Sequence, residues 1–583
     1  MSKPLGSFNF VLHSHIPYVL AHGISPHGTD WLSEAAAECY LPLLDVCNTL
    51  IAEGISPKIT VGLTPVLVEQ LADPWFKDEF ASYLKQHVEQ ASADQREFRA
   101  SGNYHQAYLA RFWEDWYADR LASFEAIPER DIIGAFKRFQ DDGHVEIISS
   151  SATHGYSPLL SEDATIQAQV KTGIDSYVRH FGRRPVGYWL PECGYRPRYE
   201  WRTPNVADSA TDQQQPYRLR KGVEEFLAEN GIRYFFADSQ LLQGTEGLGV
   251  YGDRFDALTT LWADYERHHV AVPKSFSPYC AYRVNSSDRA LPDISVFSRD
   301  PATGLQVWSA EHGYPGDSWY LEFHKKHDGL ASKSLGLRYW RVTRDPVDPN
   351  NKALYEPHRV PERIADQADH FVSVVRNVLA TQAPDGHGIV NSVYDTELFG
   401  HWWFEGPQFL YDAIKRMAAQ PDIIRQTCSD YLTTTTREST SIQLPEGSWG
   451  QGGFHWIWLN QNTAWVWDMV YKAESAMKDV LSAHGSDKRV ARLLRQAARE
   501  LLLITSSDWP FCISTGGAAD YAAVRVRNHF DNFSALIDLI RRVAGGYELT
   551  ASDRTNFAEC EDRDRLFPHI DIRWFDSLDY PTR

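Results

Sequence analysis

The sequence NSVYDTELFGHWWFEGPQFL, from Asn391 to Leu410, decides the fold class. It starts inside a run of apolar and β-branched residues, Ile389 to Tyr394, that predicts a buried strand. Two carboxylates and three aromatic side chains follow this strand: Asp395, Glu397, His401, Trp402 and Trp403. Apolar surroundings raise the pKa of a carboxyl group by desolvation, which suits acid catalysis. Because flat aromatic faces also stack on pyranose rings, the pattern favours a carbohydrate site at the end of this strand.

A second short apolar strand, in VGYWLPECGY from Val186 to Tyr195, ends in a similar way. It delivers Glu192 between Pro191 and Cys193. Side chains at the carboxyl ends of parallel barrel strands converge on one pocket, however far apart they lie in the sequence. We therefore expect Glu192 and Asp395 to share one site, which is the arrangement that glycoside chemistry requires.

Strand and helix patterns alternate along the chain before Asp395. Further strands are expected at Phe8–Leu12, Lys58–Leu63, Val145–Ser150, Tyr234–Ala237, Ser295–Ser298 and Gln306–Ser309. Helices are expected at Trp31–Glu53, within 74–140, and at Asp163–Phe181, Val223–Asn230 and Pro361–Thr381. This alternation predicts a parallel α/β sheet closed as a barrel, with the site at one rim.

Two regions depart from the alternation. The stretch from Gln240 to Val284 is irregular and rich in glycine, which predicts a lid or a binding loop. After Gln408 the chain is mainly helical, at Phe409–Ala419, Asn462–Ser482, Lys488–Thr505 and Tyr521–Ala544. The turns GSWGQGG and SSDWPF are too polar and aromatic for plain connectors, so we expect a helical domain that packs against the barrel face.

Composition excludes several classes of partner. The 583 residues carry a net charge of −19, which argues against nucleic acids and anionic membranes because their recognition needs basic patches. The seven cysteines are scattered without a CxxC pair, as is typical of reduced thiols in the cytosol. No apolar signal segment or spanning run of about eighteen apolar residues is found. We expect a soluble, cytoplasmic monomer or small homo-oligomer, and the 19 tryptophans hint at carbohydrate.

Seven sequence blocks, in order along nearly the whole chain, form a specific set. They are HSHIPY at His13, EIISSSATHGYSPLL at Glu146, WLPECGYRPRYEW around Glu192, QVWSAEHGYPGD at Gln306, YDTELFGHWW around Asp395, GSWGQGGFHWIWLN at Gly447 and SSDWPF at Ser506. Together they resemble glycoside hydrolase family 57, specifically its α-1,4-glucan branching enzymes. The resemblance implies an enzyme without a cofactor that cleaves α-1,4 bonds in amylose, amylopectin or glycogen and forms α-1,6 branches.

The resemblance also sharpens the fold to an incomplete (β/α)7 barrel with an inserted small subdomain and a C-terminal helical domain. The barrel would comprise residues 1–200 and 285–415, the inserted subdomain 201–284, and the helical domain 416–583. A 4-α-glucanotransferase or an α-amylase-like hydrolase of the same family is the alternative function.

The resemblance assigns Glu192 as the nucleophile and Asp395 as the general acid/base of a retaining double displacement. The sugar-binding residues that it implies are His13, His15, His154, Trp308, Trp402, Trp449, Trp458 and Asp508. One of Trp402 and Trp403 is expected to pack inward. Taken alone, the spacing of His13 and His15 fits a metal site nearly as well. Metal-dependent carbohydrate deacetylases on related barrels use His and Asp in this way and are a less favoured alternative; the resemblance implies no metal.

Two departures from the family pattern concern chain transfer. The family segment WPxGxxWL reads SPHGTDWL here, so Ser25 replaces the first tryptophan while Trp31 matches the second, and one donor or acceptor subsite is expected to differ. In the family, a loop with a tyrosine at its tip closes over the site and favours transfer over hydrolysis. The corresponding region here, Gln240 to Val284, is longer, and three tyrosines are candidates for the tip: Tyr251, Tyr265 and Tyr279.

Overall fold

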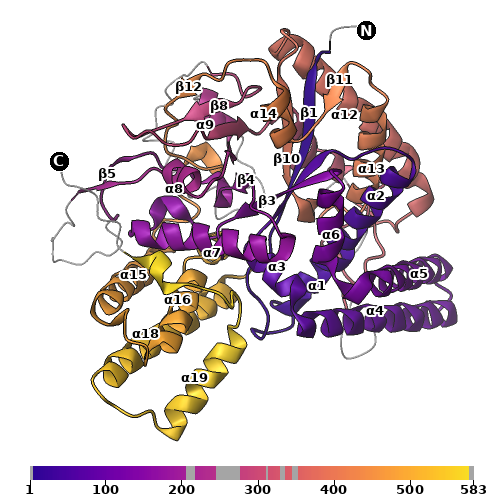
Figure 1. Cartoon of the computed structure of the whole chain (residues 1–583). Helices are drawn as coiled ribbons and strands as arrows, with labels where there is room; N and C mark the ends of the chain where they lie inside the picture. The colour runs from indigo at the N-terminus through magenta and orange to yellow at the C-terminus, as the bar shows by residue number, and fades with distance from the viewer. Residues whose placement is uncertain are drawn as a thin grey trace.

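The computed structural model describes residues 4–204, 217–243, 276–309, 313–327, 335–343 and 352–576. In this part, one curved sheet has ten strands, and seven of them are parallel neighbours in the order β10, β1, β2, β3, β4, β7, β9. Figure 1 labels β1, β3, β4 and β10 of this series. The bounds of the seven are β1 Gly6–Ser14, β2 Ile59–Leu63, β3 Val145–Ser150, β4 Gly187–Trp189, β7 Tyr234–Ala237, β9 Ser295–Ser298 and β10 Ile389–Asp395. Among the described residues β9 and β10 do not pair with each other, so the predicted incomplete barrel is confirmed.

The core of the barrel is built around β1, because all nine of its residues are buried. A strand covered on both faces has a nearly continuous apolar sequence. Phe10 stacks on Phe371 of helix α12, Val360–Gln382, with ring centroids 5.3 Å apart. The polar Asn9 is satisfied inside this core because its amide donates to the Thr60 hydroxyl at 3.1 Å.

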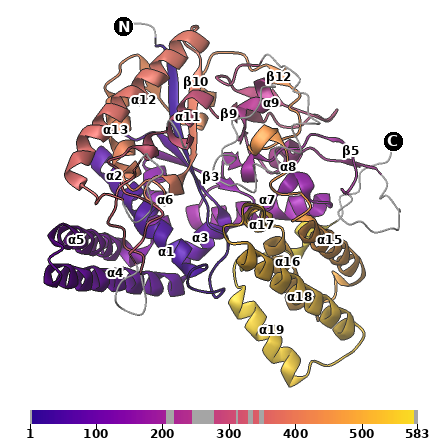
Figure 2. The same cartoon turned by 180° about the vertical axis from the view of Figure 1, so that it is seen from behind.

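Helices cover the outer side of the sheet (Figures 1 and 2). They include α2 Leu41–Ala52, α6 Ile132–Asp141, α7 Asp163–Phe181, α12 and α13 Gly406–Ala418. The segment Thr29–Ala52, which comprises α1 Thr29–Ala35, a π-helical turn Ala36–Tyr40 and α2, is long and apolar enough to span a membrane. However, 72% of its apolar window is buried inside the fold, as in the core helix of a globular domain.

Two further sets of helices lie beside the barrel (Figure 2). The predicted helices within 74–140 include a long hairpin, α4 Pro74–Ala100 and α5 Tyr104–Ala126. The predicted C-terminal helical domain is also confirmed: α15 Ala464–His484, α16 Ala491–Ile504, α17 Asp508–Thr515, α18 Ala519–Ala544 and α19 Ala551–Arg563. The turn between α16 and α17 reaches the barrel, where the backbone N–H of Ser507 donates to the His154 carbonyl at 3.0 Å.

One predicted strand is wrong. Residues 306–308 lie at the end of helix α11, Pro301–Trp308, instead of in a strand. Asp300 caps this helix by accepting hydrogen bonds from the backbone N–H groups of Ala302 and Thr303, and proline occupies the first helical position. A run of four residues around Trp308 was too short to distinguish the end of a helix from a strand.

Candidate active site

Both predicted carboxylates lie at the carboxyl edge of the sheet. β10 ends at Asp395, which is the register partner of His13 near the end of β1. β4 ends at Trp189, and Glu192 follows it in a short 3₁₀ turn, η4 Pro191–Cys193. The negative charge of Asp395 contributes to the raised pKa of Glu192. The structure therefore brings the two carboxylates together, as expected for residues that follow parallel strands.

The backbone of Glu192 is held in an uncommon conformation. Its φ and ψ angles are 61° and 23°, in the left-handed region that few residues other than glycine adopt. The backbone N–H of Trp449 donates to the Glu192 carbonyl at 3.0 Å and thereby fixes the turn. Backbone strain of this kind persists where the surroundings determine it, and it is frequent at functional sites.

The Glu192 carboxyl group is held at both oxygens. The Trp449 indole N–H donates to Oε2 at 2.8 Å, and the Ser507 hydroxyl donates to Oε1 at 2.8 Å. Burial raises the pKa of Glu192 to about 7, with a further contribution from the negative charges of Asp508 and Asp395. The hydrogen bonds from Ser507 and Trp449 act in the opposite direction because they stabilise the ionised form.

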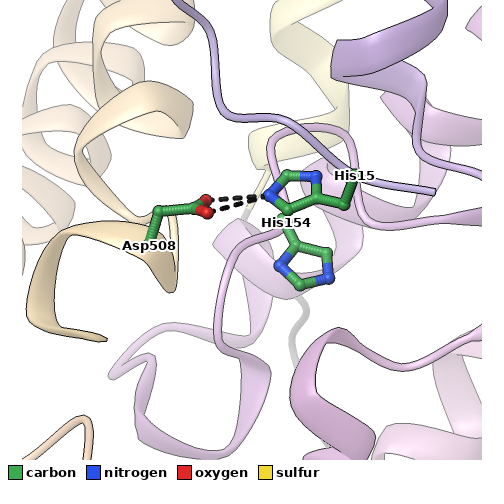
Figure 3. A group of neighbouring side chains, drawn as sticks. All are labelled: His15, His154 and Asp508. Carbon is green, nitrogen blue, oxygen red and sulfur yellow. Dashed lines mark hydrogen bonds and ion pairs between the residues drawn. The ribbon is translucent and has the colours of Figure 1, made fainter. Parts of the chain in front are cut away.

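Three histidines and an aspartate gather beside Glu192, and Figure 3 shows His15, His154 and Asp508. His15 Nε2 lies 2.9 Å from Asp508 Oδ2, and the rings of His15 and His154 stack with centroids 3.9 Å apart. His154 Nε2 lies 3.1 Å from His13 Nε2. These residues come from the ends of β1 and β3 and from the start of α17, so the barrel and the helical domain build the cluster together.

The four groups differ in charge because their surroundings differ. Burial lowers the pKa of His13 and His154 well below the usual value, so both are neutral at pH 7. Burial also opposes the charged form of His15, but the adjacent Asp508 carboxylate outweighs it and raises the pKa of His15. Although burial disfavours its ionised form, contact with His15 lowers the pKa of Asp508 to about 2. The cluster therefore contains one ion pair and two neutral imidazoles.

A further carboxyl group lies next to this cluster. Glu397, two residues after Asp395, accepts hydrogen bonds from the Tyr40 hydroxyl at 2.5 Å and from the His15 backbone N–H at 3.1 Å. Burial raises the pKa of Glu397 to about 7. The sequence analysis named Glu397 among the carboxylates after the strand but gave it no catalytic or binding role. It gave Ser507 and Tyr40 no role. Ser507 lies inside a quoted motif and could have been considered, whereas no local signal marks Tyr40.

The predicted tryptophans fall into two groups. Three are buried side chains: Trp308, Trp449 and Trp458. Trp402 is 40% exposed and stacks on Phe323 with ring centroids 4.3 Å apart, whereas Trp403 is buried. The expectation that one member of this pair packs inward is therefore confirmed. Trp456, which the sequence patterns did not single out, is also exposed at 38%.

Tyr279 does not occupy the position expected for the tyrosine at the tip of a loop that closes over the site. Its backbone carbonyl accepts from the N–H of Ile389 at the first residue of β10, and its buried hydroxyl donates to Asp300 at 3.0 Å. Tyr279 therefore lies near the end of β10 opposite to Asp395, and its candidacy is wrong. Tyr251 and Tyr265 lie outside the described residues.

The histidine cluster also offers donor atoms for a metal ion. His15, His154 and Asp508 each place one candidate ligand atom within 4.8 Å of the others. All four ring nitrogens already have protein partners: Thr64 and Asp508 for His15, and Ser507 and His13 for His154. A metal ion would have to replace some of these hydrogen bonds.

The family comparison covers most of the chain. Residues 9–445 match the model of glycosyl hydrolase family 57, and residues 469–575 match the C-terminal domain of 1,4-alpha-glucan branching enzymes. The two matches correspond to the barrel and to the helical domain described above.

Individual proteins agree with the family match. A 1,4-alpha-glucan branching enzyme of Thermococcus kodakarensis is 40% identical over 96% of this chain and 77% of its own. Its crystal structure superimposes with a TM-score of 0.87 at 37% identity, covering 99% of this chain and 98% of that one. The branching enzyme structure from Pyrococcus horikoshii gives a TM-score of 0.84 at 36% identity over 99% and 98%. The chain belongs to glycoside hydrolase family 57.

Proposed function

We propose that this protein is a 1,4-α-glucan branching enzyme, in which Glu192 is the nucleophile and Asp395 the general acid/base. The observation that carries this proposal is the convergence of the two carboxylates at the carboxyl edge of one sheet, with Glu192 hydrogen-bonded at both oxygens. Further support comes from relatives that are named as branching enzymes and that align over nearly the whole chain.

The first step cleaves an α-1,4 bond of the donor chain. An ionised Glu192 oxygen attacks the anomeric carbon while Asp395 donates its proton to the glycosidic oxygen, and the shortened chain leaves as a free alcohol. A retaining mechanism of this kind needs carboxyl groups about 5 to 5.5 Å apart. The donors on Glu192 orient the carboxylate before the substrate arrives, which reduces the reorganisation needed for attack.

The second step forms the branch. Asp395 removes the proton from the 6-hydroxyl of an acceptor glucan, whose oxygen attacks the anomeric carbon and breaks the bond to Glu192. Water must be kept from the glucosyl-enzyme for transfer to exceed hydrolysis. Apolar walls support this: the Trp449 ring packs edge-on against Trp189 at 5.2 Å and against Trp308 at 6.4 Å.

The setting proposed for the enzyme is the cytoplasm, where it would branch a glycogen-like polymer as a monomer or small homo-oligomer. All seven cysteines are free thiols, as in a reducing compartment. A neutral glucan also suits a chain with a net charge of −19 better than an anionic partner does.

Incubation of amylose with the protein, followed by a debranching enzyme specific for α-1,6 bonds, tests the proposal. We expect the second enzyme to release short linear chains. Glu192→Gln should release none, with a loss of about 10³-fold or more in turnover, because the amide cannot act as nucleophile. Release from the Gln variant would refute the assignment. A chelator should leave the branching activity unchanged. Loss of activity on addition of the chelator would favour a metal-dependent deacetylase instead.

A further inference from the structure

A chain of three hydrogen bonds runs from His13 to Glu192. His13 Nε2 lies 3.1 Å from His154 Nε2, and His154 Nδ1 lies 2.8 Å from Ser507 Oγ. The Ser507 hydroxyl then donates to Glu192 Oε1 at 2.8 Å. All four side chains belong to buried residues, so solvent does not compete for these bonds.

The direction of the chain follows from its partners. The Trp449 indole N–H can only donate, and Ser507 donates as well, so the ionised Glu192 accepts at both oxygens. The oxygen of Ser507 is then free to accept from His154 Nδ1–H. Because burial lowers the pKa of His154, its neutral ring carries a single N–H, and its Nε2 must be an acceptor. His13 Nε2–H therefore donates to His154.

A proton on Glu192 is disfavoured by this arrangement. On Oε2, a proton would leave a weaker acceptor for the Trp449 N–H, and a proton directed at that N–H would set two donors against each other. On Oε1, a proton directed at Ser507 would force all three bonds to reverse, and His13 would then carry its hydrogen on Nδ1. That atom is buried and has no hydrogen-bond partner among the described residues. An N–H buried without an acceptor is costly.

We propose that His13, His154 and Ser507 are positioning residues that hold the Glu192 carboxylate ionised and fixed in direction, and that His154 acts on the reaction through Ser507 instead of binding sugar. This rests on the proposed function, in which Glu192 is the nucleophile. Both nitrogens of His154 are occupied within the protein, by Ser507 and His13. Its ring therefore has no free N–H for a glucan hydroxyl in this arrangement.

Three variants test the chain through the pH dependence of kcat/KM. Ser507→Ala and His154→Ala should move the acid limb to higher pH by about one pH unit, because each loses hydrogen bonding that favours the carboxylate. His154→Asn can place its amide N–H where Nδ1–H was, so its limb should stay near that of the unmodified enzyme. Glucan affinity, measured in the Glu192→Gln background by affinity electrophoresis, should be unchanged in all three.

His87→Ala provides a matched control, because His87 is equally buried but lies on α4 and bonds the Tyr83 carbonyl. It should change neither the limb nor the affinity. Weaker glucan binding in His154→Ala with an unmoved limb would overturn the proposal and make His154 a sugar ligand. If that variant fails to fold, Ser507→Ala decides alone, and an unmoved limb overturns the proposal. If the proposed function is wrong, the unmodified protein will form no α-1,6 bonds, and this outcome is distinct from any change in the acid limb of the variants.

Discussion

At Glu192, two opposing effects act on one carboxyl group. Burial raises its pKa to about 7, while the donors Ser507 and Trp449 lower it. In the proposed mechanism, Glu192 must be ionised to attack, while Asp395 must supply a proton in the first step. The hydrogen bonds from Ser507 and Trp449 favour the ionised form of Glu192, which is the form that the proposed role as nucleophile requires.

The first prediction concerns the pH profile of the unmodified enzyme. The acid limb of kcat/KM should lie near pH 7, because kcat/KM reports the free enzyme, in which Glu192 loses its proton at about that pH. Initial rates on amylose between about pH 5 and 9 measure it. A limb near the ordinary glutamate value of about 4.5 would contradict the raised pKa.

The same shift has a consequence for stability. A carboxyl group whose pKa is higher in the folded state than in the unfolded state contributes stability in full at pH values below its unfolded-state pKa. For Glu192 this contribution is lost as the pH rises through its folded-state pKa of about 7. At pH 8, Glu192→Gln should therefore have a larger free energy of unfolding than the unmodified protein, by at most about 3 kcal/mol, and should melt at a higher temperature. At pH 4 the two should melt alike, and a gain of equal size at pH 4 would argue against this cause.

At the scale of elements, the helical domain completes a barrel site. The loop 447–460 supplies Trp449, and the turn between α16 and α17 supplies Ser507, so both donors on Glu192 come from outside the barrel. The same turn places Asp508 against His15. Neither the barrel nor the helical domain alone contains the whole arrangement.

Trp402 lies on the turn after β10. Its exposed indole, backed by Phe323, offers a flat face to a glucan ring. Trp402→Ala should raise KM for amylose by about tenfold, which corresponds to about 1.4 kcal/mol, and change kcat little. Trp75→Ala is the matched control, because Trp75 is also 40% exposed but lies on α4. Equal effects of the two substitutions would rule out a specific role.

Much of the barrel could be predicted from the sequence, because buried parallel strands have apolar runs that end in polar residues. The ends of β4 and β10 pointed to Glu192 and Asp395 without further information. The helix α11 was missed because a short apolar run does not separate helix from strand. The hydrogen bonds to the Glu192 carboxylate could not be predicted for a different reason. Ser507 lies 315 residues away in the sequence, and only the tertiary structure brings its hydroxyl to the carboxylate.

At the scale of the whole molecule, a second buried cluster joins the two ends of the chain. His22, which follows β1, bonds Asp564 through Nε2 at 2.6 Å, and His529 of α18 bonds Glu500 of α16 at 2.7 Å. Arg525 donates to both His529 and the Tyr18 carbonyl. The cluster fixes the segment after His15 against the helical domain that carries Asp508.

Removal of one member should therefore loosen the docking of the helical domain. His529→Ala leaves the buried Glu500 without one of its hydrogen-bond partners, at a cost of about 1 to 3 kcal/mol, because burial favours the uncharged form of both groups. Thermal unfolding and limited proteolysis measure the effect, which should include a lower kcat. His569→Ala, at a surface histidine that is 65% exposed, should cost less than about 0.5 kcal/mol. Equal melting temperatures for the two variants would contradict this role.

A branching enzyme transfers glucan chains to 6-hydroxyl groups, and proton NMR of amylose before and after incubation can detect this transfer. One spectrum reports α-1,4 signals, α-1,6 signals and reducing ends. We expect a growing α-1,6 signal with few new reducing ends, since the proposed glucosyl-enzyme on Glu192 must be shielded from water for transfer to exceed hydrolysis. Rising reducing ends without an α-1,6 signal would contradict this expectation and identify a hydrolase.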